Sequence, residues 1–498
     1  MVPAPVAGWA DPDIFRLMAL AELVDVSGFE QRWRADGVGG IPYDPRLMLV
    51  TVWWCMYRQI RSPQQMAWQC RESVSLRMVW QRERVPSAAA LRRFLAGHQI
   101  GWQRVVVSLL AACDQAGLVD VSLTATDSTP VAAPAALSKT LTAPRITVLI
   151  DQAERDLATL RARIADLAAQ DPAAFVESGA ELHRSEQLLL VRLGRLRRAE
   201  TLARQRAADQ AQPGGRDRRS PVLTWQSRVD KHTAELAAMT ERQHQAVADY
   251  QAKVDAGRKP PGPAPHPPEQ HPHIHQKTQA LHRAQVRLAA AQASHDHHRP
   301  NTAAARANTT DPDARILKGK NTTTWVLGRL LTITVAVGQL ILAALLSPAG
   351  NDHPGLLPNL AAATTNTRTA AITQPFGHHL ADNGFANTTA FTTPPPGGGT
   401  LLVAVTNEHD QTHRRQPTTI TSHARQQMAT RLATPENHAL YTRRSPMIEP
   451  VFAHLLRGNR RLHTRGHTSQ HNEILALTTA YNAHKYLRHH KPPTPTGT

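Results

Sequence analysis

The chain of 498 residues has few cysteines, few aromatic side chains and fewer acids than bases. Its three cysteines, Cys55, Cys70 and Cys113, form no Cys-x-x-Cys pair, which excludes a disulfide framework and a paired-cysteine zinc site and favours a reducing cytoplasm. The first residues lack a basic segment followed by a long apolar one, so no signal peptide is expected. The 57 basic and 39 acidic side chains give a net charge of +18, which suits a polyanionic partner but also fits a generic basic surface.

One segment, from Trp325 to Leu346, is long and apolar enough to raise the question of a membrane span. It contains Arg329, an alternation of Thr with Ile and Val from Thr332 to Val335, and a break at Gly338-Gln339. These features predict two strands joined by a tight turn, and we therefore expect no membrane partner.

Residues 1–118 are predicted to be helical. Apolar and aromatic residues recur at helical spacing between Asp44 and Trp80, with a break at Ser62-Pro63, where Ser can cap a helix and Pro can occupy its first turn. A later helix carries Arg92 and Arg93 on one face. Short helices with a basic helix last are typical of helix-turn-helix DNA-binding domains, so these two arginines are candidate DNA contacts. An ordinary helical bundle with solvated arginines explains the pattern nearly as well.

Residues 145–300 are predicted to be a helical insertion. Apolar residues recur in alternating steps of three and four over 150–167, which is the seam of a coiled coil, and further helices are expected over Leu182–Leu196 and Trp225–Val254. Such an arm could dimerise the protein or clamp DNA, and a passive spacer explains the pattern equally well. The Pro and His content of Lys259–His275 predicts a flexible linker whose histidines are solvated.

Three acidic residues far apart in sequence stand where a carboxylate could hold a metal ion. Asp127 follows an alternating run, Val119 to Thr126, which predicts a strand with one buried face that stops at Pro130. Asp382 lies in Ala-Asp-Asn-Gly-Phe, where Asn and Gly can supply the positive φ of a tight turn. Glu449 lies beside a proline near the start of a helix, at the edge of its apolar stripe.

The neighbours of these acids resemble those in the DDE transposases of bacterial insertion sequences. A Ser-Thr pair follows Asp127, Ala381 to Phe385 reproduces the family's Ala-Asp-x-Gly-aromatic turn, and Tyr441 and Arg444 stand before Glu449 as a Tyr-x-x-Arg signature. Other stretches that resemble the family are Thr310 to Arg315, Arg465-Gly466 and Tyr481 to Lys485. The chain departs from the family pattern in having Leu456 and Arg457 where a lysine often stands, and Gly328-Arg329-Leu330-Leu331-Thr332 in place of Gly-Tyr-Asn-Ala-Gln.

The resemblance implies an α/β fold, in which an RNase H-like mixed sheet flanked by helices carries an all-α N-terminal domain and a long helical, coiled-coil-like insertion. The domains expected from it are a helical, DNA-binding N-terminal domain over 1–118, the first core strand over 119–144, the insertion and linker over 145–300, the remaining core over 301–490, and a disordered tail over 491–498.

The resemblance also implies that Asp127, Asp382 and Glu449 together hold two Mg²⁺ ions, for which Mn²⁺ can substitute. Carboxylates are suitable ligands because hard cations prefer oxygen, and two ions can activate the nucleophile and stabilise the leaving group of phosphodiester cleavage. Asp352 is the main rival for the second position. Taken singly, each acid also fits an ordinary role, as a turn residue or as a complement to a helix dipole. Residues expected to contact DNA are Tyr441, Arg444, Arg457, Arg92 and Arg93.

The function implied is therefore that of a DNA transposase. Water would cut at the end of the element, and the freed 3′-hydroxyl would attack target DNA. The partners implied are double-stranded DNA, as inverted repeats and as target, and a second or further copy of the chain in a homodimer or higher oligomer. The expected location is the bacterial cytoplasm, in association with the nucleoid. The alternative is a catalytically degenerate copy or a transposition repressor that keeps only DNA binding.

Overall fold

The computed structural model describes residues 11–31, 41–81, 83–211, 219–258, 262–296, 305–318, 325–347, 354–405, 422–458 and 460–489. The chain divides into two compact units. Unit 1 comprises Met1–Leu141, Arg145–Ala199 and Ala307–Thr498, and unit 2 comprises Thr142–Pro144 and Glu200–Arg306.

The N-terminal part of unit 1 is helical. Its helices are α2 (Pro12–Glu22), α3 (Ser27–Glu30), α4 (Pro45–Tyr57), α5 (Pro63–Glu72), α6 (Val74–Val79), α7 (Ala88–Gly97) and α8 (Gln99–Gln115). The helix boundaries follow from local sequence, since α5 begins with a proline in its first turn and the Ser87 side chain caps α7 by accepting from the Ala90 N–H at 3.2 Å. The predicted helices on either side of Ser62-Pro63, and the later one with the two arginines, are confirmed.

These helices share their hydrophobic core with the rest of unit 1. Trp53 and Trp102 are fully buried in the same apolar cluster as Val335 of the sheet and Ile474 near the C-terminus. The Trp53 Nε1–H also donates to Thr479 Oγ1 at 3.1 Å. Because the cluster is continuous, the N-terminal helices do not enclose a core of their own, and the boundary expected at residue 118 stays a prediction.

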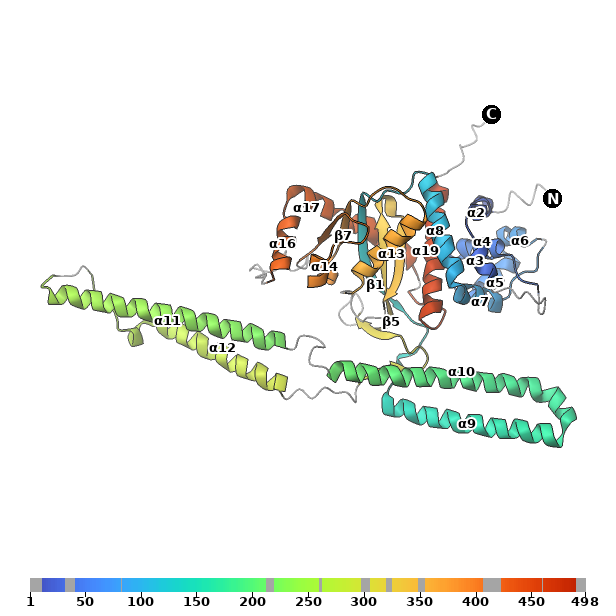
Figure 1. Ribbon diagram of the computed structural model, residues 1–498, viewed down its shortest axis with the longest axis horizontal. Coiled ribbons are helices and arrows are strands. Elements are labelled where there is room, and N and C mark those ends of the chain that lie inside the picture. The colour runs from blue at the N-terminus through green and yellow to red at the C-terminus, as the bar shows by residue number, and fades with distance from the viewer. Residues whose placement is uncertain are drawn as a thin grey trace, which may run out of the picture. The chain divides into compact units, whose positions relative to one another are not determined.

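A mixed sheet forms the centre of unit 1 (Figure 1). Strand β5 (Trp325–Ala336) pairs antiparallel with β1 (Leu123–Ala132) on one side and with β4 (Arg315–Lys318) and β6 (Ile341–Ser347) on the other. Strand β7 (His378–Ala381) lies parallel to β1 and to β8 (Thr400–Val403). The hairpin β5–β6 turns at Gly338, whose φ is 76°, so the prediction of two strands in place of a membrane span is confirmed. Strands β2 (Thr140–Thr142) and β3 (Arg306–Asn308) pair separately.

Two predictions about the first strand are wrong. Strand β1 does not stop at Pro130 but continues to Ala132, and both of its faces are buried over Leu123–Thr126. Pro130 is tolerated because β1 pairs with β7 only as far as Thr126, so the proline, which has no N–H, lies where that side of the strand has lost its partner. Both faces are buried because helices cover the sheet on each side.

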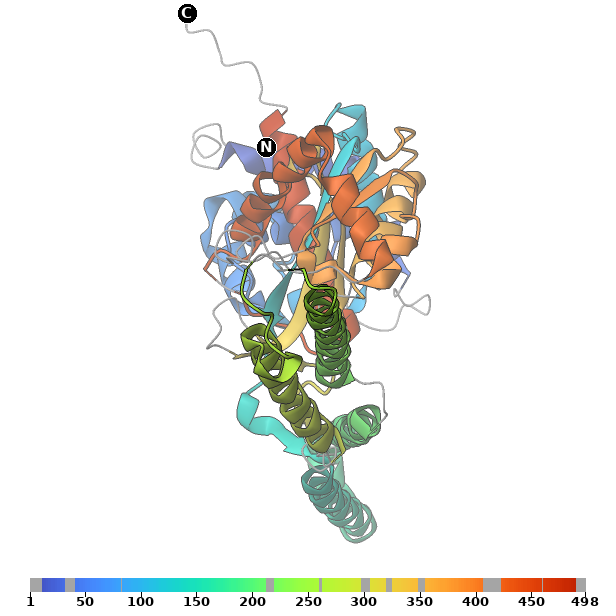
Figure 2. The same cartoon turned by 90° about the vertical axis from the view of Figure 1, so that its left-hand side faces the viewer.

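The helices that cover the sheet follow β6 in sequence. They are α13 (Leu356–Thr369), α14 (Thr388–Thr392), α16 (His423–Leu432), α17 (Pro435–Thr442), α18 (Arg444–Leu455) and α19 (His467–His489). Asn359 of α13 donates to the Thr332 carbonyl oxygen at 2.9 Å, on the sheet face where Thr126 and Thr334 pair through their hydroxyls. Helix α18 lies against β1, and α19 lies along β6, where the Asn482 amide bonds both backbone groups of Ile341. Figure 2 shows the sheet between helices.

A network of buried charges connects three segments of unit 1. Arg329 of β5 is 1% exposed and Asp311 is fully buried; the guanidinium Nη2 lies 3.3 Å from Asp311 Oδ1. Gln470 of α19 accepts from Arg329 Nε and donates to Asp311 Oδ2 at 2.6 Å. Asp313 joins the network and also pairs with Arg198 at 2.7 Å. The Gly328-Arg329 departure from the family pattern therefore supplies the cation for an acid in the Thr310 to Arg315 stretch.

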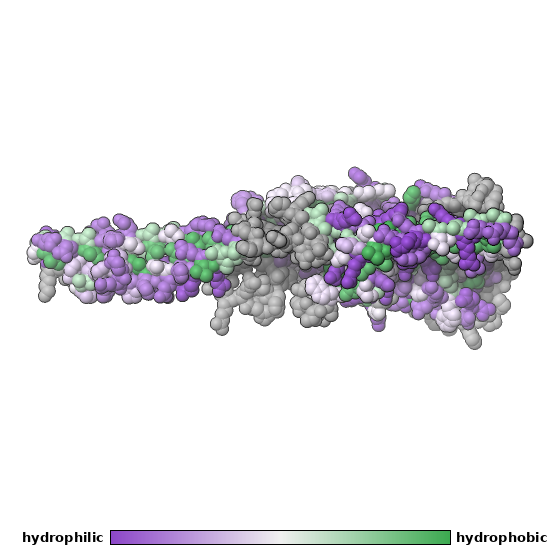
Figure 3. Space-filling model, turned by 90° about the horizontal axis from the view of Figure 1, so that it is seen from below, coloured by the Kyte–Doolittle hydropathy of each residue, from purple (hydrophilic) through white to green (hydrophobic). Residues whose placement is uncertain are grey.

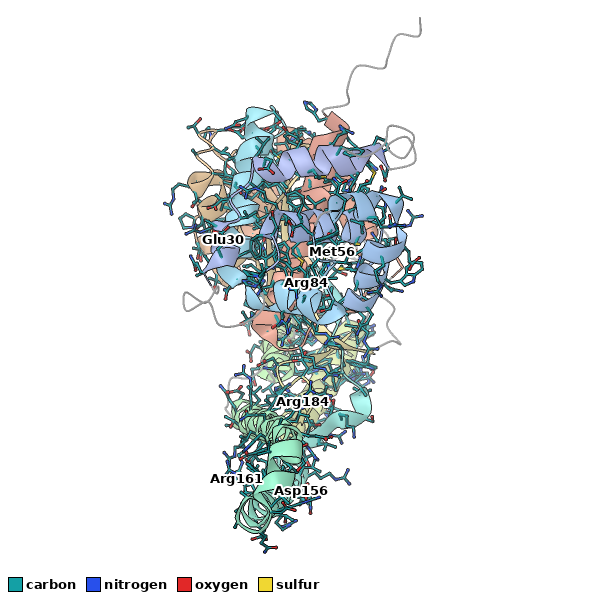
Figure 4. All side chains as sticks on the ribbon, turned by 90° about the vertical axis from the view of Figure 1, so that its right-hand side faces the viewer. Glu30, Met56, Arg84, Asp156, Arg161 and Arg184 are labelled. Carbon is teal, nitrogen blue, oxygen red and sulfur yellow. The ribbon has the colours of Figure 1, made fainter. Side chains whose placement is uncertain are left out.

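The insertion begins with α9 (Ala143–Gln170) and α10 (Pro172–Ala211), which belong to unit 1 from Arg145 to Ala199. The two helices run antiparallel, because Arg161 pairs with Glu186 and Arg197 pairs with Glu154, both at 2.7 Å. Ile150 and Leu157 of α9 and Leu193 and Leu196 of α10 are buried, as the apolar spacing predicts. Figure 4 shows Asp156, Arg161 and Arg184 extending from this hairpin.

In unit 2, α11 (Arg219–Asp255) packs along α12 (Pro272–Asp296). The short helix η2 (Pro268–Gln270) lies between them in sequence. Lys277 pairs with Glu235 across the two helices, and the surface of this hairpin is mostly hydrophilic (Figure 3). The flexible linker predicted over Lys259–His275 extends too far. His273 and His275 belong to α12, which begins with Pro272 in its first turn. The first residues of the predicted linker, 259–261, and the predicted disordered tail, 491–498, lie outside the described residues, as do residues 213–215 before α11. Across the described ranges, no helix is long and apolar enough to cross a membrane.

Candidate active site

The parallel pairing of β1 and β7 brings Asp127 and Asp382 together. The last residue pair of this ladder is Thr126 with Ala381, and each aspartate is the next residue along the chain. Neighbouring strands lie about 4.8 Å apart, and residues in parallel register share a face. Both aspartates are half-buried, and Asp382 Oδ1 accepts from the Gly384 N–H at 3.0 Å in the turn that the sequence predicts. The two acids therefore follow the last paired positions of the parallel ladder, Asp127 within β1 and Asp382 directly after β7.

Two residues before and within β7 fix its position against β1. A Cβ on Gly377 would lie 2.2 Å from the Ser122 carbonyl oxygen, so only glycine allows the strands to approach here. His379 is 1% exposed; its Nδ1 lies 2.7 Å from Thr124 Oγ1 and its Nε2 lies 3.0 Å from the Gly398 carbonyl oxygen. Burial lowers the pKa of His379, so this imidazole is a neutral structural link.

The part of β1 that carries Asp127 is open on one side. After β7 ends opposite Thr126, no further strand among the described residues pairs with that edge of β1 until the bridge at Ala132. There the Ala132 N–H donates to the Arg460 carbonyl oxygen, and the Leu462 N–H donates to that of Ala132, both at 2.8 Å. Asp127 thus lies in a gap of the sheet, with exposed arginines on the segment that closes the gap.

Arg444, at the start of α18, lies against Asp127. It is buried, at 7% exposure, and its Nη1 lies 3.6 Å from Asp127 Oδ2. Its guanidinium carbon also lies 5.8 Å from the centre of the half-buried Tyr441 ring. The guanidinium of Arg444 therefore pairs with Asp127, one of the three predicted site acids. Its predicted contact with DNA, and that of Tyr441, stay predictions.

Glu449 lies on the same helix but points elsewhere. The buried side of α18 carries Arg444, Ile448 and Val451, whereas Glu449 is exposed and accepts a hydrogen bond from Ser445 of its own helix. Glu449 is five positions after Arg444, so the two side chains point in directions about 140° apart around the helix axis. The helix that brings Arg444 to Asp127 thus turns Glu449 away from it.

The acids do not form a closed metal site in this structure. The described residues include no group of three or more His, Cys, Asp or Glu side chains that could hold an ion. The chemistry of the donors still suits a hard divalent cation, because Asp127 and Asp382 supply carboxylate oxygens directly after the last pair of one strand ladder. Asp352, the rival for the second position, lies outside the described residues.

The other predicted DNA contacts are exposed. Arg92 and Arg93 project from α7 beside the buried Leu91 and Phe94, as expected for either a DNA contact or a solvated face. Arg457 lies just beyond the end of α18 and is also exposed. Their contact with DNA stays a prediction.

One structural residue near the site was missed by sequence reasoning. Glu473 of α19 is 3% exposed and accepts from the backbone N–H groups of His463 and Thr464 at 2.8 to 3.0 Å. It thereby holds the segment that pairs with Ala132 and exposes Arg465. A glutamate inside an apolar helical stretch, at 473 of Glu-Ile-Leu-Ala-Leu, was the available signal.

Two family models match parts of this chain. Residues 405–487 match the family model described as Transposase DDE domain, and residues 11–96 match the model described as Transposase domain (DUF772). No curated protein and no solved structure gave a significant match. The first match contains Glu449, while Asp127 and Asp382 lie outside both.

These two matches confirm the resemblance to the DDE-type transposases of insertion sequences. They support a transposase function, with DNA as partner and, for a DDE domain in general, the use of a divalent metal.

Proposed function

We propose that this protein cuts DNA and transfers the cut strand in a reaction that depends on a divalent metal, Mg²⁺ in the first instance. The observation that supports the proposal is the register of β1 and β7, because Asp127 and Asp382 each follow the last paired residue of this parallel ladder. We further propose that the sheet is RNase H-like. Its antiparallel hairpin β5–β6 next to β1, followed by parallel strands on the other side, supports that assignment.

Asp127, Asp382 and Glu449 would hold the metal through carboxylate oxygens. A bound divalent ion would supply positive charge to the phosphoryl group in the transition state and lower the pKa of the attacking water. The chain's own residues place that chemistry: β1 and β7 fix the two aspartates, and Arg444 balances the charge of Asp127. The arginines on residues 460–465 flank the gap, where they can neutralise DNA phosphates.

The proposal requires Glu449 to reach the aspartates when DNA is bound. In this structure it is exposed, bonded to Ser445 and in the middle of α18, which contacts β1. The expectation that Glu449 lies near the start of its helix is wrong, because α18 begins at Arg444 and accepts Pro450 in its interior. A change in the rotation or position of α18 would bring it closer. The role of Glu449 therefore needs a test separate from that of the aspartates.

The test is nicking of a supercoiled plasmid that carries the DNA flanking the gene, which supplies the inverted repeats. We expect cutting in Mg²⁺ or Mn²⁺ by the unaltered protein and at least a hundredfold less by Asp127→Asn and Asp382→Asn, because each removes a charged ligand while keeping side-chain size. Glu449→Gln should be equally weak if Glu449 completes the site.

A matched control is Asp151→Asn, on the exposed face of α9, which should cut normally. Equal cutting by Asp127→Asn and the unaltered protein would remove Asp127 from the site. Normal cutting by Glu449→Gln alone would leave the aspartates in place and exclude Glu449.

A further inference from the structure

A pocket lined by aromatic rings and cations lies between α4, α18 and α19, and the proposed active site does not use it. Its volume is about 190 Å³, and a second hollow of about 370 Å³ adjoins it through Tyr57 and His454. Arg457 lines the second hollow. Other residues that line the first are Pro450, Tyr481, Lys485 and Arg488.

Stacked rings make the walls of this pocket firm. The Tyr57 ring stacks on His484, with ring centres 3.4 Å apart, and His454 lies 4.8 Å from Tyr57 and 5.3 Å from Tyr481. His484 is itself buried, so the stack is anchored in the core.

Neutral groups hold the pocket's cations in place. Arg488 Nη2 donates to the Tyr57 hydroxyl at 2.6 Å. Lys485 Nζ donates to the Gly338 carbonyl oxygen at 3.1 Å and to Gln339 Oε1 at 3.0 Å. Such acceptors fix the position of a charge without cancelling it, which is the arrangement of a site prepared for an anion.

The charge of the pocket is not balanced from within the protein. Within the ranges that the structure describes, neither Lys485, Arg457 nor Arg488 lies within salt-bridge distance of a carboxylate, although the neighbouring Arg58 pairs with Asp11. The pKa of His454 is lowered by burial and then by the surrounding cations, Arg488 first, so the imidazole is neutral. The pKa of Lys485 is lowered by burial and by Arg488.

We propose that this pocket binds a phosphate group, with Lys485 and Arg488 as its donors and Arg457 at its rim. A tetrahedral oxyanion accepts several charge-assisted hydrogen bonds at once, and a guanidinium together with an ammonium can supply them. If the proposed function holds, the phosphate belongs to the DNA backbone; free phosphate offers the same chemistry. The pocket joins the two segments that match transposase families, since Tyr57 lies in the segment 11–96 and Lys485 in the segment 405–487.

The experiment compares the full-length protein with the double variant Lys485→Gln/Arg488→Gln by two measurements. Calorimetric titration with inorganic phosphate should show binding that the double variant loses. Binding to a random duplex of about 30 base pairs at several salt concentrations should show a slope of log K against log salt that is smaller by about 0.9 in the double variant, as for one phosphate contact.

The two sources of phosphate are separated by the pair of results. Loss of phosphate binding together with the smaller slope supports a DNA phosphate, and loss of phosphate binding with an unchanged slope supports a free phosphate. Unaltered behaviour of the double variant in both measurements overturns the proposal.

Two variants guard against misfolding and nonspecific charge effects. Arg457→Gln, at the exposed rim, should weaken phosphate binding with no effect on folding, whereas the exposed Arg77→Gln on α6 should leave phosphate binding unchanged. Both measurements are repeated on Asp127→Asn, where phosphate binding should persist. A failure of the proposed cutting reaction would therefore leave this result intact.

Discussion

Replacement of Arg329 by methionine should destabilise unit 1 more than most single changes would. The substitution leaves Asp311 fully buried, with the Gln470 amide at 2.6 Å but without the guanidinium at 3.3 Å. Removal of one partner of a buried ion pair costs about 3–5 kcal/mol, because the remaining charge stays desolvated. Asp313, 3.6 Å from the guanidinium, is partly solvated and adds less.

The loss should depend on pH. Burial raises the pKa of Asp311 above its ordinary 3.8, and Arg329 is the largest influence that opposes this rise. Without Arg329 the folded-state pKa rises further, so the folded variant keeps a proton that the unfolded chain has released. Its stability then falls as pH increases from about 3.8 to the raised pKa and is constant above it. The difference from the unaltered protein should therefore shrink on acidification.

The assay is urea denaturation followed by tryptophan fluorescence, since Trp53 and Trp102 are buried in the shared core of unit 1. The double variant Arg329→Met/Asp311→Leu removes both charges and should recover most of the loss, to within about 1 kcal/mol of the unaltered protein. A cost below about 1 kcal/mol for the single variant, or a double variant less stable than the single one, would refute the reasoning.

Three further changes test other contacts. Asn482→Ala leaves both backbone groups of Ile341 without their amide partner, and thermal denaturation should show a loss of about 2–4 kcal/mol; an unchanged midpoint would contradict this. Glu473→Gln keeps size but removes the charge that holds the segment ending at Thr464, so trypsin should cut at the neighbouring arginines faster than in the unaltered protein, and equal rates would argue against it. Gly377→Ala places a methyl group 2.2 Å from the Ser122 carbonyl oxygen, directly before β1, so β7 must shift. Nicking should therefore fall at least tenfold while folding is largely kept, and full activity would show that the strand position is not critical.

Elements with a strong local signal could be predicted from sequence. The proline and serine that start α5 and α7, the turn at Gly338 and the apolar seam of α9 each act within a few residues, so their structures follow from nearby chemistry. The extent of β1 could not be predicted. Pro130 is acceptable in the strand only because β7 has already ended beside it, and β7 lies about 250 residues later in the chain.

The candidate site was predictable in part for the same reason. Strand and turn signals gave the settings of Asp127 and Asp382, and the structure adds the register that makes them neighbours. Sequence spacing gave the apolar stripe of α18 but not the direction of its polar side chains. Arg444 faces an acid, and Glu449 faces solvent, because packing against β1 sets the rotation of the helix.

The most direct test of a shared metal site is cleavage of the protein itself by bound iron. Fe²⁺ in place of Mg²⁺, with ascorbate and peroxide, generates radicals that cut the backbone next to the ion. We predict fragments that end near Asp127 and near Asp382 in the same sample, a further cut near Glu449 when DNA is present, and loss of all of them in Asp127→Asn or with excess Mg²⁺. Cuts at only one aspartate, or cuts that persist in Asp127→Asn, would contradict the claim that the two aspartates hold one ion between them.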